Sequence, residues 1–351
     1  MSFLKFFIII ILVVSPVACG DNEPSAKKLF ALEFDGAKKG HKVTEPFNIS
    51  VKSRKGNIID SVAFSIDNRK IPASNGNSVQ TIDVSEMNLG IRVVTAKIFS
   101  EGLSYELADK VILLASETPK LFTYKIIESY PHDINAYTQG LEFHNDTLYE
   151  STGQYKRSSL RKTNYITGEV LQNVSLGDGF FGEGLTILNN KIYQLTWQEN
   201  TGFIYNLETM ENTGTFVYGE SQEGWGLCNN SQVIYKSDGT ERIWSLNSET
   251  LAEEGYIEIY TNTAKIPKVN ELEWVEGKIY ANIYQKDAIA VVNPDNGAVE
   301  GVINLKGLKE KVKQHEKLDV LNGIAYKGEP NILYVTGKNW DSLFKIEIVE
   351  K

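Results

Sequence analysis

Ile192-Tyr193 is one of five copies of the same pair, an apolar residue followed by tyrosine, in the last two thirds of the chain. The copies are Leu148-Tyr149, Ile192-Tyr193, Ile234-Tyr235, Ile279-Tyr280 and Leu333-Tyr334. Their tyrosines stand 44, 42, 45 and 54 residues apart. A strand pattern that repeats about every 45 residues is typical of propeller blades. We therefore predict a five-bladed β-propeller over residues 118–351, with a charged insertion at 306–317 that lengthens the last interval and with residues 121–128 completing the last blade beside residues 343–349.

A second repeated element stands ten to twelve residues before each of these tyrosines. Its copies are Gln139-Gly140-Leu141, Glu183-Gly184-Leu185, Glu223-Gly224-Trp225, Asn270-Glu271-Leu272 and Asn322-Gly323-Ile324. Each opens the first strand of a predicted blade, and the first strands all run in one direction around the axis of a propeller. Glycine lets the backbones crowd near that axis without side-chain clash. We expect a ring of polar groups in the channel, formed by Gln139, Glu183, Glu223, Asn270 and Asn322.

Residues 28–117 show a different pattern. Apolar and polar residues alternate at 47–51, 62–66 and 93–99, which predicts short strands at the spacing of a β-sandwich. The stretch resembles a bacterial immunoglobulin-like module, and it contains none of the repeated elements. The predicted fold is therefore all-β: an immunoglobulin-like β-sandwich followed by the propeller. The 17 Tyr, 15 Phe and 28 Gly of the chain agree with short strands and tight turns.

The first residues resemble a bacterial lipoprotein signal. Lys5 precedes an apolar run at 6–14, and Val17-Ala18 lead to Cys19. We expect residues 1–18 to be a signal peptide, Cys19 to be lipidated, and residues 19–27 to be a polar tether. The protein would then be exported and anchored to the bacterial membrane by lipid, facing the periplasm or the cell surface. Pro16 departs from the lipoprotein pattern, which leaves simple secretion as the alternative.

Charge and composition exclude several classes of function. The chain has 45 acidic and 36 basic residues, a formal net charge of -9, which disfavours nucleic acid as a partner. Its four histidines show no spacing typical of metal ligands, and no nucleophile elbow, phosphate loop or dinucleotide fingerprint occurs. We expect neither a metal nor a cofactor. Cys228 is the only cysteine besides Cys19, so acylation of Cys19 would leave no intrachain disulfide.

Aromatic residues accompany the predicted polar ring. They are Tyr137, Phe181, Trp197, Trp225 and Tyr284, each within a few residues of a ring position or on the next strand. Propeller channels can be lined by hydrogen-bonded amides and carboxylates around ordered water, with no ligand. Aromatic side chains at a wet channel mouth favour binding instead. Both interpretations remain open from the pattern alone.

Seven motifs follow one another along the propeller region: residues 136–141, 181–186, 194–197, 223–227, 270–273, 321–325 and 336–340 (AYTQGL, FGEGLT, QLTW, EGWGL, NELE, LNGIA and TGKNW). In order and spacing, they resemble the motifs of the plant-type, metal-independent glutamine cyclotransferases. The resemblance covers about residues 122–348. It implies a five-bladed propeller, which agrees with the number of repeats.

The resemblance also implies roles for individual residues. The acid/base carboxylate falls on Glu183, and Lys338 or the Asn270 amide would stabilise the oxyanion. The expected substrate-binding residues are Tyr137, Gln139, Phe181, Trp197, Trp225, Tyr284 and Asn322. Tyr137 stands where the family usually has Phe, and Tyr284 where it usually has Trp. Both departures add a hydroxyl to an aromatic face, so they bear on substrate preference.

The predicted function is conversion of N-terminal glutamine of peptides or proteins to pyroglutamate, with release of ammonia, by a monomeric enzyme. Two alternatives remain. One is a non-catalytic propeller on the cell surface that binds peptides or another partner, and the other is an enzyme with a shifted substrate. A binder needs aromatic walls but no acid/base group with oxyanion donors. The combination of Glu183, Asn270 and Lys338 therefore favours catalysis.

Overall fold

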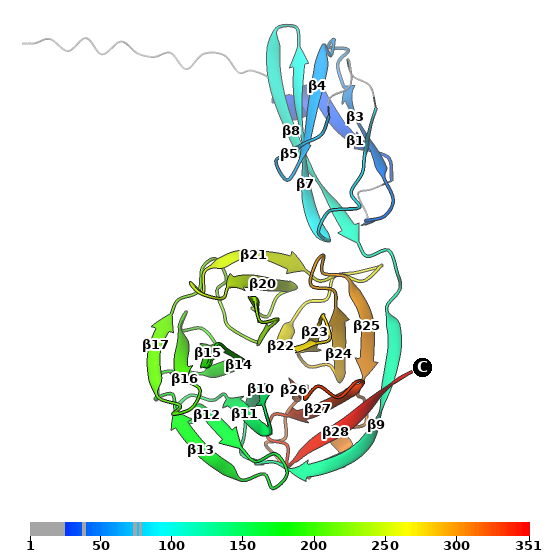
Figure 1. Ribbon diagram of the computed structural model, residues 1–351. Coiled ribbons are helices and arrows are strands. Elements are labelled where there is room, and N and C mark those ends of the chain that lie inside the picture. Colours follow the sequence, from blue (N-terminus) through cyan, green and yellow to red (C-terminus); the bar gives the residue numbers. More distant parts are fainter. Residues whose placement is uncertain (1–24, 37–39, 73–75, 77–78) are drawn as a thin grey trace, which may run out of the picture.

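The computed structural model describes residues 25–36, 40–72, 76 and 79–351. In Figure 1, blades surround a central channel, and a second, smaller β unit stands against the rim of the ring. The predicted signal peptide, Cys19 and most of the predicted tether lie outside the described residues. Within those residues, no helix is both long and apolar enough to cross a membrane.

The smaller unit consists of two sheets that share one core. A three-stranded sheet has the order β1-β3-β6 and a five-stranded sheet has the order β2-β8-β7-β4-β5. Alternate residues of facing strands, such as Phe47 of β3 and Val94 of β7, are buried between them. The strands are β1 (Phe30–Phe34), β2 (His41–Lys42), β3 (Phe47–Ser53), β4 (Ser61–Ile66), β5 (Arg69–Lys70), β6 (Gln80–Ile82), β7 (Gly90–Ser100) and β8 (Leu103–Leu114). A β-sandwich is therefore present, and its immunoglobulin-like character stays a prediction.

The described chain begins with a short helix that the sequence did not predict. Helix α1 (Ala26–Leu29) has only four residues, and Leu29 is buried against the sandwich core. Ala26 and Lys27 were expected to be the end of the tether. Four residues are too few for a helix to be stable alone, so this one depends on the packing of its apolar residue.

The propeller has five four-stranded blades. The first three are separate sheets, and the last two belong to one eight-stranded sheet. Blade 1 contains β10 (Thr138–His144), β11 (Thr147–Thr152), β12 (Ser159–Thr163) and β13 (Val170–Ser175). Blade 2 contains β14 (Gly182–Leu188), β15 (Lys191–Thr196), β16 (Gly202–Asn206) and β17 (Asn212–Phe216), and blade 3 contains β18 (Leu227–Asn229), β19 (Val233–Ser237), β20 (Arg242–Asn247) and β21 (Glu253–Glu258). Blade 4 contains β22 (Val269–Val275), β23 (Lys278–Ile283), β24 (Ala288–Val292) and β25 (Val299–Asn304).

Blade 5 closes the ring with strands from both ends of the propeller. It consists of β26 (Leu321–Ala325), β27 (Ile332–Gly337), β28 (Ser342–Glu350) and β9 (Lys120–Pro131). β9 pairs antiparallel with β28 over nearly its whole length, and at Lys120 to Phe122 it also pairs with β25 of blade 4. The first strand of the propeller thus joins the last blade, as residues 121–128 were expected to do. The charged insertion at 306–317 is a loop with one short 3₁₀ helix (Lys309–Lys311).

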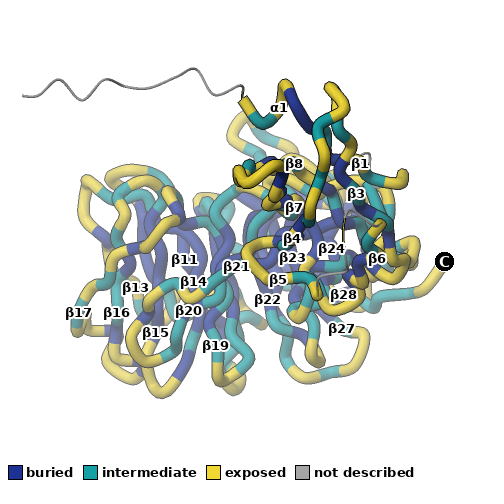
Figure 2. Tube along the Cα trace, turned by 90° about the horizontal axis from the view of Figure 1, so that it is seen from above, coloured by how far each residue is buried: buried dark blue, intermediate teal, exposed yellow. Residues whose placement is uncertain are grey.

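Burial decreases from the channel outward. Nearly every residue of the innermost strand β14 is buried, whereas β13 on the outside alternates between exposed and half-buried residues. Figure 2 shows the same gradient, with buried residues inside the ring and exposed residues on loops and outer edges. Each repeated apolar-tyrosine pair lies on the second strand of its blade, where its apolar residue packs into the core between blades.

The innermost strands share an irregularity that shapes the channel. The pairing of the first with the second strand shifts at Gln139, at Glu183-Gly184, at Asn270-Glu271 and at Asn322-Gly323. A β-bulge of this kind turns a side chain out of the regular alternation. Four of the five predicted ring residues therefore lie at bulges that direct them toward the axis.

The sandwich contacts the rim of blades 3 and 4 through specific interactions. Arg92 Nη2 lies 2.7 Å from Glu258 Oε2, and both side chains are largely buried. The Leu89 N–H donates to the Asn296 carbonyl at 3.1 Å. Tyr260, a propeller residue, packs into the sandwich core. These contacts join the two units by a buried ion pair and an apolar anchor.

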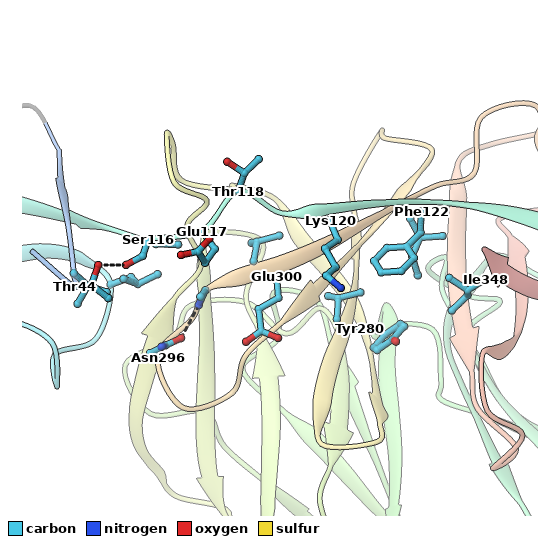
Figure 3. Close-up of a pocket in the computed structure, with 18 of the residues that line it drawn as sticks. Thr44, Ser116, Glu117, Thr118, Lys120, Phe122, Tyr280, Asn296, Glu300 and Ile348 are labelled. Atoms are coloured by element: carbon cyan, nitrogen blue, oxygen red, sulfur yellow. Dashed lines mark hydrogen bonds between the residues drawn. The ribbon is translucent and has the colours of Figure 1, made fainter. Parts of the chain in front are cut away.

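A cavity of about 710 Å³ opens where the connection between the two units crosses the outer edge of blade 4. Figure 3 shows its lining, with Thr44 hydrogen-bonded to Ser116 on one side and Phe122 and Ile348 on the other. None of the site residues predicted from the sequence lines it. The residues predicted to form the site lie elsewhere, around a smaller cavity at the channel mouth.

Candidate active site

The predicted catalytic and substrate-binding residues other than Asn322 meet in a cavity of about 310 Å³ at one end of the propeller channel. Gln139, Glu183 and Asn270 come from the bulges of three innermost strands, and Lys338 directly follows β27. The aromatic residues come from segments that flank the strands at the same end of the blades. The complete lining is Tyr137, Gln139, Gln154, Phe181, Glu183, Trp197, Trp225, Asn270, Tyr284 and Lys338.

Glu183 is the buried carboxylate of this cavity. The residue is 4% exposed, and its Oε1 accepts a hydrogen bond from Gln139 Nε2 at 2.7 Å. Burial raises the pKa of Glu183 well above its usual range. The positive charge of Lys338 opposes that rise, and the negative charges of Glu223 and Glu199 add to it. A raised pKa moves a carboxyl group toward the working range of acid/base catalysis.

A chain of amides orients that carboxylate. Asn322 Nδ2 donates to Gln139 Oε1 at 3.1 Å and to the Thr138 carbonyl at 3.0 Å. Because the Gln139 oxygen is occupied by this bond, its amino group points to Glu183. Asn322 is fully buried and does not line the cavity. The structure therefore gives Asn322, predicted to bind substrate, a place behind Gln139 rather than beside a ligand.

Lys338 is a buried cation held by aromatic faces. It is 4% exposed, and its Nζ lies 4.8 Å from the ring centre of Tyr137 and 5.4 Å from that of Tyr284. Burial lowers the pKa of Lys338, although the charges of Glu183 and Asp319 oppose that shift. Among the residues that the structure describes, no carboxylate lies within 4.0 Å of its ammonium group. The ammonium is thus free to donate to a bound molecule.

Asn270 supplies a second unengaged polar group. Its Oδ1 is buried and has no hydrogen-bond partner within the described part of the chain. A buried amide without a partner costs free energy, so such a group points to a ligand that completes its hydrogen bonds.

Aromatic rings enclose the rest of the cavity in edge contacts, with interplanar angles from 62° to 89°. Phe181 contacts Tyr137 and Trp197 with ring centres 6.2 and 5.7 Å apart, and Trp225 contacts Tyr284 at 5.6 Å. Edge-to-face contacts of this kind fix ring orientations. The walls are therefore suited to the methylene groups of a small substrate, and the polar groups to its ends.

The two added hydroxyl groups differ in their surroundings. The Tyr137 hydroxyl donates to Asp319 Oδ2 at 2.8 Å, so it is already engaged by the protein. The Tyr284 hydroxyl makes no hydrogen bond to any other described residue. An effect on substrate preference is therefore expected from Tyr284 rather than from Tyr137.

Glu223 does not belong to the ring, in contrast to the sequence prediction. Strand β18 begins only at Leu227, and a Cβ on Gly184 would meet the Cα of Gly226 at 2.6 Å. Gly226 therefore takes the axial position in blade 3, and the residue before it, Trp225, is the ring member. The Glu223 carboxylate lies behind the tryptophans instead.

Spacing could have suggested this register from three of the other four blades, although Asn322 also stands twelve residues before its tyrosine. Trp225 stands ten residues before the tyrosine of its blade, as do Gln139, Glu183 and Asn270, whereas Glu223 stands twelve before. Gln154 is the one lining residue that sequence reasoning missed. It follows β11 in a loop with no repeated pattern, and we find no signal in the sequence that marks it.

No group of three or more His, Cys, Asp or Glu side chains in the described part of the chain is arranged to hold a metal ion. Cys228 is buried, as expected for a small apolar residue in the core of blades 3 and 4. The polar groups available for chemistry at the channel mouth are therefore a carboxyl, an ammonium and amides.

Comparison with known proteins agrees with this geometry. Residues 93–348 match the sequence model of the family described as glutamine cyclotransferase. The chain belongs to the glutamine cyclotransferase family. The match starts inside β7 of the sandwich, earlier than the resemblance recognised from motifs, and it ends in β28 of the last blade.

Two relatives of this family are similar over most of their length. A glutaminyl-peptide cyclotransferase of Arabidopsis thaliana is 36% identical over 227 residues, which are 64% of this chain and 71% of the relative. The crystal structure of Myxococcus xanthus glutaminyl cyclase matches with a TM-score of 0.62 and 32% identity, covering 66% of this chain and 99% of that one. About two thirds of this chain thus accounts for nearly all of the solved relative.

Proposed function

We propose that this protein converts the N-terminal glutamine of peptides to pyroglutamate and releases ammonia, with Glu183 as general acid/base. The observation that carries the proposal is the buried Glu183 carboxyl, held by Gln139 in a cavity whose opposite polar groups are Lys338 and Asn270. Membership of the family and the names of both relatives support the same activity.

The size of the cavity fits one amino-acid residue. A volume of about 310 Å³ is at the lower end of the range for small-molecule sites, which is roughly 300–1,000 Å³. The glutamine side chain would lie between the aromatic walls, and the rest of the peptide would leave through the open mouth. A cavity of this size favours recognition of the terminal residue over a long stretch of sequence.

The reaction forms one C–N bond and breaks another. The α-amino nitrogen attacks the side-chain carbonyl carbon, and the carboxamide nitrogen leaves as ammonia. Holding the glutamine in a folded conformer removes most of the entropic barrier to five-membered ring closure. Glu183 accepts the proton that the attacking amine loses and delivers it to the departing nitrogen, so the enzyme returns to its starting state.

Charge on the carbonyl oxygen would be stabilised by the N–H donors of the Lys338 ammonium and of the Asn270 amino group, whereas the partnerless Asn270 Oδ1 can only accept a hydrogen bond, for example from the α-amino group of the substrate. The Lys338 ammonium and the Asn270 amide both face the cavity. In a site shielded from water, such donors stabilise a developing oxyanion more strongly than water does. Gln139 keeps Glu183 in place while the proton moves.

Product analysis by mass spectrometry tests the proposal. We expect a Gln-Ala peptide to lose one ammonia and to gain a blocked N-terminus, whereas the N-acetylated peptide, which has no free amine, should remain unchanged. An Asn-Ala peptide should react far more slowly because its ring would have four members. If the protein binds Gln-Ala without converting it, the non-catalytic propeller becomes the better account.

For location and assembly we propose export, a lipid anchor on Cys19 and a monomeric state. The support is the sequence of the first 19 residues and the closure of the propeller by its own β9 and β28. Detection of a diacylglycerol on the mature N-terminus, and a monomeric mass in light scattering, are the results expected. Cleavage at another position would favour simple secretion.

A further inference from the structure

We infer that Glu223 is a positioning residue that aligns the two tryptophan walls of the cavity through one carboxylate. This inference rests on the proposed function, because it concerns the same site. Glu223 Oε2 accepts hydrogen bonds from Trp197 Nε1 and from Trp225 Nε1, both at 2.8 Å. Glu223 Oε1 accepts a third bond, from Gln198 Nε2 at 2.9 Å.

The two indoles belong to different blades. Trp197 follows β15 in blade 2, and Trp225 precedes β18 in blade 3. An indole N–H can only donate, so both indoles need an acceptor oxygen, and one oxygen with two lone pairs can serve both. A carboxylate oxygen meets this need, and its charge strengthens each bond. The Glu223 side chain therefore couples the orientations of two walls that belong to different blades.

The backbone of Glu223 is itself fixed by a buried lysine. Lys236 Nζ donates to the Glu223 carbonyl at 2.7 Å and to the Ser221 hydroxyl. The lysine is fully buried, 3.6 Å from Glu253 Oε1, and its Nζ lies 4.3 Å from the ring centre of Tyr218. A buried charge needs such partners to remain in place.

Close packing adds a second constraint on the same segment. A Cβ on Gly224 would lie 2.5 Å from the Tyr218 hydroxyl and 2.6 Å from the Thr196 carbonyl. The Gly224 N–H also donates to the Trp197 carbonyl at 2.9 Å. Segment 221–225 is thus held against blade 2. If an indole moved, the Glu223 side chain could move little with it, so the hydrogen bond between them would weaken.

Glu223 also acts on Glu183 through its charge. Its carboxylate contributes to the raised pKa of Glu183, after the larger effect of burial. Removal of this negative charge should therefore lower the pKa of Glu183. The acid limb of the pH profile would move to lower pH, a change that loss of packing alone does not predict.

The test compares Glu223→Gln with Glu220→Gln in the full chain. Glu220 is exposed, three residues earlier, and its carboxylate has no hydrogen bond to any described residue. Glutamine keeps an oxygen that can accept from both indoles but removes the charge that strengthens these bonds, so both bonds should weaken. We expect Glu223→Gln to raise KM for a Gln-peptide roughly tenfold, to change kcat much less, to shift the acid limb downward, and to alter tryptophan emission. Glu220→Gln should match the wild type in all four.

Three outcomes would overturn the inference. One is a loss of kcat in Glu223→Gln as large as that of a catalytic-carboxylate variant, with KM unchanged. The second is a Glu223→Gln variant that is indistinguishable from Glu220→Gln. If Glu223→Gln does not fold, Trp197→Phe and Trp225→Phe replace it. Each removes one N–H donor but keeps a ring, and the third outcome is a wild-type KM and a wild-type acid limb in both.

Tryptophan emission separates this inference from the proposed function. The emission of Trp197 and Trp225 reports their surroundings whether or not the protein turns over glutamine. An inactive wild-type protein would therefore contradict only the proposed function. Unchanged emission in Glu223→Gln would contradict the inference that Glu223 aligns the two tryptophans.

Discussion

Glu183 shows how burial prepares a single residue for proton transfer. Replacing it by glutamine keeps its size and its bond to Gln139 but removes the exchangeable proton. General acid/base groups typically contribute on the order of 10²- to 10⁴-fold in rate. We expect Glu183→Gln to lower kcat by about that factor, with the fold and peptide affinity retained, as measured by steady-state kinetics and calorimetric binding.

Trp197→Ala serves as the contrasting variant at the same cavity. It removes wall surface that contacts substrate in the ground state and the transition state alike, so KM should rise while kcat changes less. A near wild-type kcat in Glu183→Gln would place the proton shuttle elsewhere, and Glu223 would be the next carboxylate to examine.

The state of Lys338 sets the alkaline limit of activity at the residue scale. Burial lowers its pKa from the ordinary value of 10.5, so the ammonium loses its proton at a lower pH than an exposed lysine does. Because the charged form is the proposed oxyanion donor, kcat should fall as pH rises through that lowered pKa. A pH profile of kcat measures this limb.

Lys338→Arg provides the matched variant for this pH dependence. A guanidinium stays charged throughout the accessible range, so any residual activity of Lys338→Arg should show no alkaline decline. If wild-type kcat stays constant up to the pH at which exposed lysines lose their protons, the ammonium form of Lys338 is not required.

At the scale of the secondary-structure element, glycines in the innermost strands allow the backbones of neighbouring blades to approach each other closely. A Cβ on Gly184 would lie 2.6 Å from Gly226 Cα and from Leu227 N, so backbone would have to move. Overpacking of this kind costs about 1–3 kcal/mol. We expect Gly184→Ala to lower the melting temperature by several degrees, roughly in proportion to that cost.

Gly214 in the outermost strand β17 is the control position. Its added Cβ would meet only Ile204 Cδ1, at 3.9 Å. Gly214→Ala should therefore unfold at nearly the wild-type temperature in the same calorimetric scan. Equal melting temperatures for both variants would show that the axial contact between blades 2 and 3 tolerates a side chain.

Sequence spacing predicted the elements of the propeller well, because each blade repeats one strand pattern. It placed the pairs such as Ile192-Tyr193 on one strand per blade and predicted the strand that closes the ring. It did not predict the register of blade 3. There β18 is short, and Glu223 stands three residues before Gly226, which takes the axial position. The bulges that aim Gln139 and Asn270 inward depend on pairing with the next strand, which spacing alone cannot show.

The residue types of the site were also predictable, but their mutual contacts were not. Glu183, Lys338 and the aromatic residues were expected on the basis of family motifs, and all of them line one cavity. Whether an amide such as Asn322 faces a ligand or supports its neighbour depends on tertiary packing. Sequence alone places it only on the same strand end.

At the scale of the whole molecule, the two units have different roles in our proposal: the propeller carries the site, and the sandwich stabilises the fold. All lining residues of the cavity come from the propeller, whereas the sandwich contacts the rim of blades 3 and 4. We expect a protein that starts near Thr118 to keep its kcat/KM on Gln-peptides. Its melting temperature should fall, because Tyr260 and Glu258 lose the residues that cover them.

Arg92→Met in the full chain measures how much of that loss of stability comes from the ion pair between Arg92 and Glu258. It leaves Glu258 without its cation but keeps the apolar cover of Tyr260, so it should destabilise less than removal of the whole sandwich. A truncated propeller that folds, shown by circular dichroism and a cooperative melt, yet cannot turn over Gln-peptides would mean that the sandwich contributes to the site.

The central claim is that this chain closes glutamine by a carboxylate shuttle, without a metal ion. The most direct measurement is ammonia release from Gln-Ala by purified residues 20–351, followed together with the cyclised peptide, before and after treatment with EDTA or a heterocyclic chelator. We predict one ammonia for each pyroglutamyl product and the same rate in both samples. Absence of ammonia from the untreated protein, or activity that the chelator abolishes and zinc restores, would contradict the account.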